Sequence, residues 1–194
     1  KIKKNKYSVV VGVAGSLGWS DHHYNYLNEY QKMGIATLSL HSFNSRGVVS
    51  TVGEQIAVTI PMVVHDAFMA LNELSKKDNI NPNKIAITGW SLGGGVALFS
   101  AWKPTIDAIS PNLKFAAHLP FYPPCVAKPD LPEFSNSPIH IMAGAMDNWV
   151  PAKPCQDLIN DLTLNGYQNA SITIFDDAHH SFDRSSNIET IKDA

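Results

Sequence analysis

The feature that most constrains this chain is a short apolar run that ends in Gly-Trp-Ser-Leu-Gly, at residues 89–93. Residues 84–88 predict a buried strand, and the run from Val96 to Trp102 is compatible with a helix. A serine at a sharp turn between a strand and a helix is typical of a nucleophile elbow, although Gly-x-Ser-x-Gly alone is a weak pattern. The alternative interpretation is a glycine-rich loop that only turns a corner.

The glycines of this motif have a steric role. A serine on so tight a turn has a strained backbone, and Gly89 and Gly93 leave room for close neighbours. The turn lifts the Ser91 hydroxyl above the sheet and points the backbone N–H of Leu92 toward a developing oxyanion. The segment therefore predicts Ser91 as a nucleophile and Leu92 as one oxyanion donor.

Short buried strands alternate with amphipathic helices along the rest of the chain. This alternation predicts the α/β class, with a mostly parallel central sheet and helices on both faces. A length of 194 residues suits a single domain spanning residues 1–194. The further strands are predicted at Tyr7–Val13, Ile35–Leu40, Phe115–Leu119, Ile139–Ala143 and Ser171–Phe175, and the helices at Asp21–Met33, Thr59–Lys76 and Pro151–Asn165.

Composition removes several classes of partner. The formal net charge of −2 gives no reason to expect a nucleic acid or an anionic membrane surface as a partner. No apolar run approaches the roughly 18 residues of a membrane span. Residues 1–16 imitate a signal peptide, because they run from basic to apolar to small. We interpret them instead as the first strand and loop of the mature domain, and the sequence assigns no oligomeric state.

A serine nucleophile needs a general base and a carboxylate that holds this base in the right tautomer. In a sheet of this kind the chain order is serine, then acid, then histidine. Asp147 follows a predicted strand and precedes a helix, so its carboxylate can reach across the end of the sheet; the alternative is an aspartate that simply precedes a helix. Asp130 and Glu133 are rivals in a proline-rich loop, while Asp176 and Asp177 lie too close to the histidines in sequence.

The general base is expected in the segment His179-His180, which follows the last predicted strand. Adjacent side chains point in different directions, so at most one of the two can act. No histidine pair has a convincing metal-ligand spacing with an acidic partner, and we predict no metal site. The remaining histidines, such as His22, His23, His65 and His140, are interpreted as surface or packing residues.

A second oxyanion donor is expected in the loop after the first strand. Ala14-Gly15-Ser16 is small and lies at that place. The N–H of Ser16 is the better candidate and that of Leu17 the next; the alternative is a simple tight turn.

The chain has two cysteines, Cys125 and Cys155. Spacing alone leaves two possibilities open: one disulfide, or two buried free thiols. A disulfide would favour a periplasmic or secreted protein, and free thiols a cytoplasmic one.

Several of these segments together resemble the dienelactone hydrolase family of the α/β-hydrolases, especially its extracytoplasmic-type members. The resemblance covers residues 7–183, and Asp-x-Trp-x-Pro and Ala-x-His-x-Phe are its more specific motifs. It implies the α/β-hydrolase fold. The matching segments, in family order, are Val9–Gly18, Ser42–Gly47, Gly89–Gly94, Tyr122–Cys125, Gly144–Pro151 with Cys155, and Ala178–Asp183.

The resemblance assigns roles to individual residues. Within Ala-x-His-x-Phe, His180 matches the family's catalytic base, and His179 falls on a position often held by glycine. The resemblance also supports Asp147 as the acid and the amides of Ser16 and Leu92 as the oxyanion hole. It favours a disulfide between the two cysteines, because both lie on family-like segments.

The chain also departs from the family pattern. The best-known member uses a cysteine nucleophile with a nearby glutamate, whereas this chain has Ser91 and, at the glutamate's place, Gly15. We expect that specialised activation to be absent, which leaves lactone specificity open. Arg46 has two interpretations, as a ligand for a substrate carboxylate or as a structural arginine that ties down its own loop. Trp90 and Tyr122 are further candidate substrate contacts.

These observations predict a serine hydrolase that cleaves a small ester or lactone through an acyl-enzyme intermediate, with no cofactor. A non-catalytic binding protein of the same fold is one alternative. An acyltransferase that uses the same three side chains is another.

Overall fold

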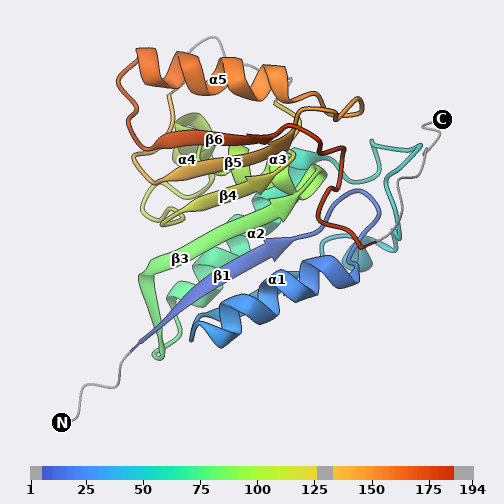
Figure 1. The fold of residues 1–194 in the computed structure, drawn as a ribbon. Coiled ribbons are helices and arrows are strands. Elements are labelled where there is room, and N and C mark those ends of the chain that lie inside the picture. Colours follow the sequence, from blue (N-terminus) through green and yellow to red (C-terminus); the bar gives the residue numbers. More distant parts are fainter. Residues whose placement is uncertain (1–5, 126–132, 186–194) are drawn as a thin grey trace.

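The computed structural model describes residues 6–125 and 133–185 of the chain. Within these ranges six strands form one sheet in the order β2-β1-β3-β4-β5-β6, and every neighbouring pair is parallel (Figure 1). The predicted α/β class is therefore confirmed. The strands are β1 (Tyr7–Val13), β2 (Ala36–Leu40), β3 (Ile80–Trp90), β4 (His118–Phe121), β5 (Ile139–Gly144) and β6 (Ala170–Phe175).

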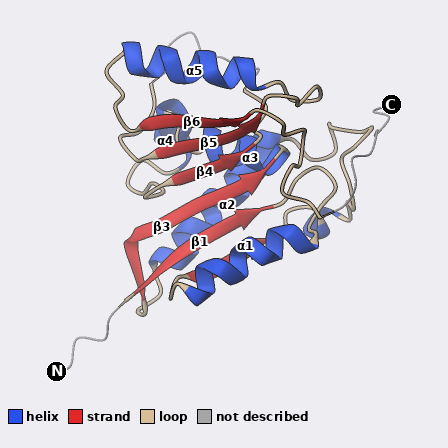
Figure 2. Cartoon of the chain, in the orientation of Figure 1, coloured by secondary structure: helices blue, strands red, loops and turns tan. Residues whose placement is uncertain are grey.

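Helices cover both faces of this sheet (Figure 2). On one face, aliphatic side chains of β1, β3 and β5 form a core with α2, α3 and α5. On the other face α1 packs on β1 and β2, and aromatic side chains fill the space over β3 and β4. The helices are α1 (Asp21–Lys32), α2 (Ile60–Ser75), α3 (Leu92–Phe99), α4 (Lys103–Ile109) and α5 (Ala152–Leu164).

Three local features differ from what the sequence pattern indicates. The segment Asn81-Pro82-Asn83, whose composition is typical of a turn, lies inside β3, because Ile80 pairs with Tyr7 of β1 while the Asn83 N–H donates to Asn81 Oδ1 in a turn-like bond. β4 begins at His118 and not at the predicted Phe115. Helix α4 was not predicted, because its seven residues bury only one side chain and give little periodic signal.

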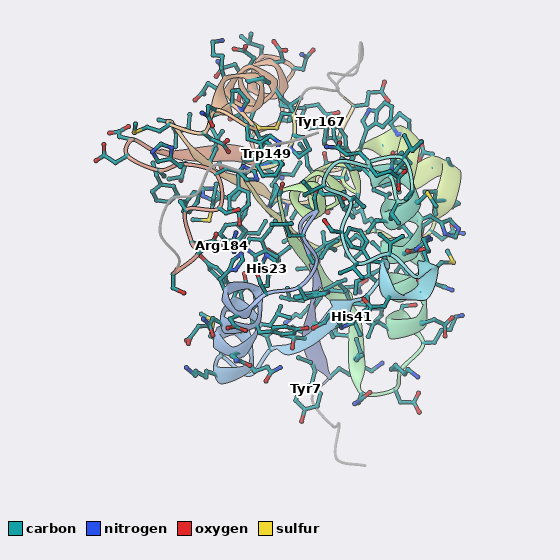
Figure 3. All side chains as sticks on the ribbon, turned by 90° about the vertical axis from the view of Figure 1, so that its right-hand side faces the viewer. Tyr7, His23, His41, Trp149, Tyr167 and Arg184 are labelled. Atoms are coloured by element: carbon teal, nitrogen blue, oxygen red, sulfur yellow. A yellow bond between two sulfur atoms is a disulfide. The ribbon has the colours of Figure 1, made fainter. Side chains whose placement is uncertain are left out.

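The carboxyl ends of the parallel strands meet at one edge of the sheet. Val13, at the end of β1, pairs with Gly89, so the loop after β1 lies directly beside Ser91. Figure 3 looks onto this edge, where it labels Trp149, His23 and His41. Ligands of open α/β sheets bind at this edge. Among the described residues no helix combines the length and apolar character needed to cross a membrane.

Candidate active site

Ser91 sits on a strained turn between β3 and α3. Its φ of 54° and ψ of −113° lie in a region that non-glycine residues rarely adopt, at a cost of about 1–3 kcal/mol. Two backbone hydrogen bonds hold the turn. The Ser91 N–H donates to the Phe121 carbonyl at 3.0 Å, and the Ser91 carbonyl accepts from the Gly95 N–H at 2.9 Å. The strain is thus supported by the neighbouring strand and the first turn of the helix.

Glycines allow the backbones around this turn to approach closely. A Cβ on Gly89 would lie 2.1 Å from the Gly93 carbonyl oxygen, and one on Gly93 would lie 2.1 Å from the Val13 carbonyl oxygen. A Cβ on Gly94 would lie 2.5 Å from the Phe121 carbonyl oxygen. All three contacts are with backbone, which cannot move aside. The steric role predicted for Gly89 and Gly93 is confirmed.

The structure brings Ser91, His180 and Asp147 together from three separate loops. His180 Nε2 lies 3.0 Å from Ser91 Oγ, and His180 Nδ1 lies 2.7 Å from Asp147 Oδ2. The Asp147 side chain is fully buried, and its Oδ1 accepts the N–H groups of Trp149 and Val150 at 3.0 and 2.8 Å. These bonds fix the direction of the carboxylate. The arrangement can pass a proton from the serine hydroxyl to an oriented imidazole.

Aromatic side chains hold the His180 ring from two sides. The ring centroid lies 4.7 Å from that of Tyr122 and 5.0 Å from that of Trp149. The Tyr122 hydroxyl donates to Asp183 Oδ1 at 2.8 Å, which ties the loop after β6 to the end of β4. Sequence reasoning gave no role to Trp149 or Asp183, although both lie in the family-like segments.

The backbone of the loop after β6 is anchored to the loop after β5. The Met146 N–H donates to the Ala178 carbonyl at 3.0 Å. A Cβ on Gly144 would lie 2.2 Å from the same carbonyl oxygen, so only glycine permits this approach. The anchor places His180, and not His179, against Ser91.

The loop after β1 lies against the elbow. A Cβ on Gly15 would be 3.5 Å from Ser91 Cβ, and the Gly18 N–H donates to the Gly15 carbonyl at 2.9 Å to close a tight turn. The Ser16 carbonyl accepts the Thr51 N–H at 2.9 Å and the Ser50 hydroxyl at 3.1 Å. The peptides of this loop are therefore fixed by the long segment that follows β2.

The three candidate substrate contacts have other surroundings. Both nitrogens of the Arg46 fork donate to Asp66, and one also donates to the Ser42 carbonyl. Hydrogen bonding to Asp66 raises the pKa of Arg46. These contacts support the interpretation of Arg46 as a structural arginine that ties down its own loop. Trp90 and Tyr122 are 0% and 1% exposed, so neither side chain presents an open surface to a ligand, and a contact with substrate stays a prediction. Their side chains pack among the aromatic residues of the sheet face that α1 covers.

His23 is buried and His22 is partly buried, and both lie on α1. His23 packs 4.5 Å from Trp90, and burial lowers its pKa to about 3, so it is neutral. His22 Nε2 lies 4.0 Å from Asp183 Oδ1, and burial lowers the pKa of His22 as well. His65 is exposed, in agreement with its interpretation as a surface residue. Within the ranges described, no group of three or more His, Cys, Asp or Glu side chains is arranged to hold a metal ion.

The remaining candidates of the sequence lie elsewhere. Cys125 and Cys155 form a disulfide, which settles the alternative left open by their spacing. The Glu133 carbonyl accepts the Lys103 N–H at 2.8 Å, beside α4. Asp130 lies outside the described residues. Asp176 and Asp177 are exposed in the turn after β6.

Comparison with known proteins adds a family and a fold. The model of the dienelactone hydrolase family matches residues 43–194. No curated protein matches the sequence.

Solved structures resemble this chain at low sequence identity. A protein from Klebsiella pneumoniae assigned as a dienelactone hydrolase has a TM-score of 0.72 and 17% identity, covering 97% of this chain and 83% of its own. Thermogutta terrifontis esterase 2 phosphorylated by paraoxon has a TM-score of 0.70 and 19% identity, covering 92% and 74%. The same esterase with bound propionate has a TM-score of 0.70 and 19% identity, covering 92% and 75%. These likenesses establish the α/β-hydrolase fold.

Proposed function

Because the chain belongs to the dienelactone hydrolase family, we propose that it is a serine hydrolase that cleaves small esters or lactones through an acyl-enzyme intermediate. The observation that carries this proposal is the continuous hydrogen-bonded path from Ser91 Oγ through the His180 ring to Asp147. The Thermogutta esterase, which binds propionate and is phosphorylated by paraoxon, supports an ester as substrate.

The first half of the reaction forms the acyl-enzyme. Ser91 Oγ attacks the ester carbonyl carbon while His180 Nε2 accepts the hydroxyl proton. Asp147 holds the imidazole with Nδ1–H toward the carboxylate and stabilises the imidazolium. The tetrahedral intermediate collapses when His180 donates this proton to the leaving oxygen. In the second half, water attacks the acyl-enzyme with His180 again as the base.

Two backbone amides are assigned to the developing oxyanion. The N–H of Leu92 lies at the first residue of α3, where helix N–H groups have no partner within the helix. The N–H of Ser16 belongs to the turn beside Ser91. The carbonyl of Ser16 is fixed by hydrogen bonds from Ser50 and Thr51. Losing one such donor typically costs about 3 kcal/mol in the barrier.

The test is covalent labelling. A fluorophosphonate probe is expected to modify Ser91, as read by peptide mass spectrometry, and the protein to hydrolyse p-nitrophenyl acetate. Ser91→Ala should abolish labelling and lower kcat by roughly 10⁴–10⁶-fold. Ser75→Ala, which removes a hydroxyl at the end of α2, is the matched control and should change neither the labelling of Ser91 nor kcat. A folded protein that is neither labelled nor active would overturn the proposal, and product analysis with an added alcohol separates hydrolysis from acyl transfer.

The disulfide between Cys125 and Cys155 supports a location in an oxidising compartment, the periplasm or the exterior. A thiol-specific mass label, applied to protein purified from its native compartment without reductant, is expected to leave both cysteines unmodified. We also propose that residues 1–194 form a single domain, because the described strands belong to one sheet.

A further inference from the structure

A cavity of about 320 Å³ lies beside the elbow, between the loop after β1 and the segment after β2. Its volume is near the lower end of the roughly 300–1,000 Å³ typical of small-molecule sites. Apolar groups make up somewhat more than half of its wall, and His41, Ser42 and Asn44 supply polar groups. Leu17, Trp19, Phe43, Val48, Val63 and Leu92 supply much of this wall.

The cavity borders the two segments that flank the nucleophile, although Ser91 itself is not part of its wall. Leu92 follows Ser91 directly and Ala14 precedes the turn against it, and both line the cavity. His180 and Asp147 come from the other half of the sheet, since they follow β6 and β5 whereas the cavity lies at the ends of β1 and β2. The leaving oxygen must lie toward His180 in order to receive its proton. This orientation leaves the side of the elbow that borders the cavity free for the acyl chain.

The cavity offers no fixed charge to a ligand. Among the described residues that line it there is no Lys, Arg, Asp or Glu, and the titratable ones are Tyr24 and His41, the latter exposed and labelled in Figure 3. The nearby guanidinium of Arg46 is already bonded to both carboxylate oxygens of Asp66. A carboxylate moved from water into this cavity would have no ion partner, which is costly.

We propose that this cavity receives a short, uncharged, apolar acyl group, so that the protein selects neutral esters over esters whose acyl part carries a second carboxylate. The inference rests on the proposed serine hydrolase function. This selectivity would differ from that of any relative that binds an acidic substrate through a free arginine, because Arg46 is already bonded to Asp66.

The test compares two p-nitrophenyl esters that share a leaving group and an acyl length. The neutral pentanoate is expected to have a kcat/KM at least tenfold higher than the glutarate monoester, after the uncatalysed rates are subtracted. Equal or faster turnover of the glutarate ester would overturn the inference.

Variants locate the effect in the cavity. Val48→Phe fills part of the cavity and should lower the ratio of pentanoate to acetate kcat/KM at least tenfold. Ile56→Phe, at a position 83% exposed and outside the cavity wall, is the matched control and should change this ratio less than twofold. Val49→Lys puts an ammonium at the exposed rim and should raise kcat/KM for the glutarate ester several-fold.

The outcomes separate the two proposals. Fluorophosphonate labelling of Ser91 in each variant establishes that the nucleophile is intact. If labelling persists while Val48→Phe leaves the pentanoate-to-acetate ratio unchanged, the cavity is not the acyl site and only this inference is overturned. If the parent protein is not labelled at all, the hydrolase function is overturned together with it.

Discussion

The nucleophile elbow and the loop that carries His180 are held by different kinds of contact. The elbow depends on backbone atoms: three glycines bring carbonyls of β1, β3 and β4 within reach of one turn. The loop after β6 depends on side chains, since His180 lies between Tyr122 and Trp149, and Tyr122 donates to Asp183. The elbow therefore tolerates no added atom, whereas the loop tolerates substitution at a graded cost.

The largest effect is expected when the elbow itself is filled. Gly93→Ala puts a Cβ 2.1 Å from the Val13 carbonyl oxygen and 2.5 Å from that of Ala14, and neither backbone can yield cheaply. We expect a loss of at least about 4 kcal/mol in the free energy of unfolding, measured by urea denaturation. Gly95→Ala, in the same helix, meets side-chain atoms of Ile60 at 2.9 Å and of Pro124 at 3.1 Å, with no backbone atom among these contacts, and should cost less. Equal losses in the two variants would contradict the backbone explanation.

Reduction of the disulfide should come next. The bond joins Cys125, which follows the Tyr122 segment, to Cys155 in α5, across a separation of 30 residues. Loop-closure entropy predicts a loss of about 3–4 kcal/mol in unfolding free energy when the bond is opened. Urea denaturation with and without reductant measures it, and a variant with both cysteines changed to Ala should no longer respond to reductant.

Low pH should lower the stability of the protein through a buried histidine that packs under α3. His118 lies 2% exposed under α3, with Nδ1 2.8 Å from the Ala97 carbonyl, and burial lowers its pKa to about 4. In the unfolded chain this histidine takes up a proton near pH 6.5. The free energy of unfolding should therefore fall as the pH drops from about 6.5 to 4, by about 3 kcal/mol for this group. Below that window this contribution is constant.

The measurement is urea denaturation at pH 7 and pH 4.5. His118→Asn keeps an N–H near the position of Nδ1 and removes the titration, so its stability should depend less on pH than that of the parent. The same substitution at exposed His65 is the control. An unchanged pH dependence in His118→Asn would exclude this histidine as the cause.

The smallest effect is expected in the histidine loop. Tyr122→Phe keeps the ring against His180 but removes the hydrogen bond to Asp183. If the proposed function is correct, kcat should fall roughly tenfold with KM unchanged, because the base is less well positioned. Tyr26→Phe removes a hydroxyl from the same aromatic cluster and is the control. A change in KM alone would instead indicate a contact with substrate.

Sequence patterns predicted different parts with different success. The long apolar periodicity of α2 and the buried strand β1 follow from residues close in sequence, and both were predicted within a residue or two. The start of β4 and the whole of α4 were missed, because a four-residue strand and a seven-residue helix carry too little periodic signal. The burial of Trp90 was missed for another reason. The sequence of β3 shows where Trp90 lies on its own strand. It does not show that aromatic side chains of other elements cover that face of the sheet.

The sequence by itself determined the α/β class, the family and the serine turn, because strand periodicity and glycine spacing are local properties that any folded context must respect. Tertiary structure decided which residues surround the His180 ring, that Arg46 is occupied by Asp66, and that an uncharged cavity opens beside Leu92. These features depend on packing between segments far apart in the chain, and no pattern of neighbouring residues encodes such distances.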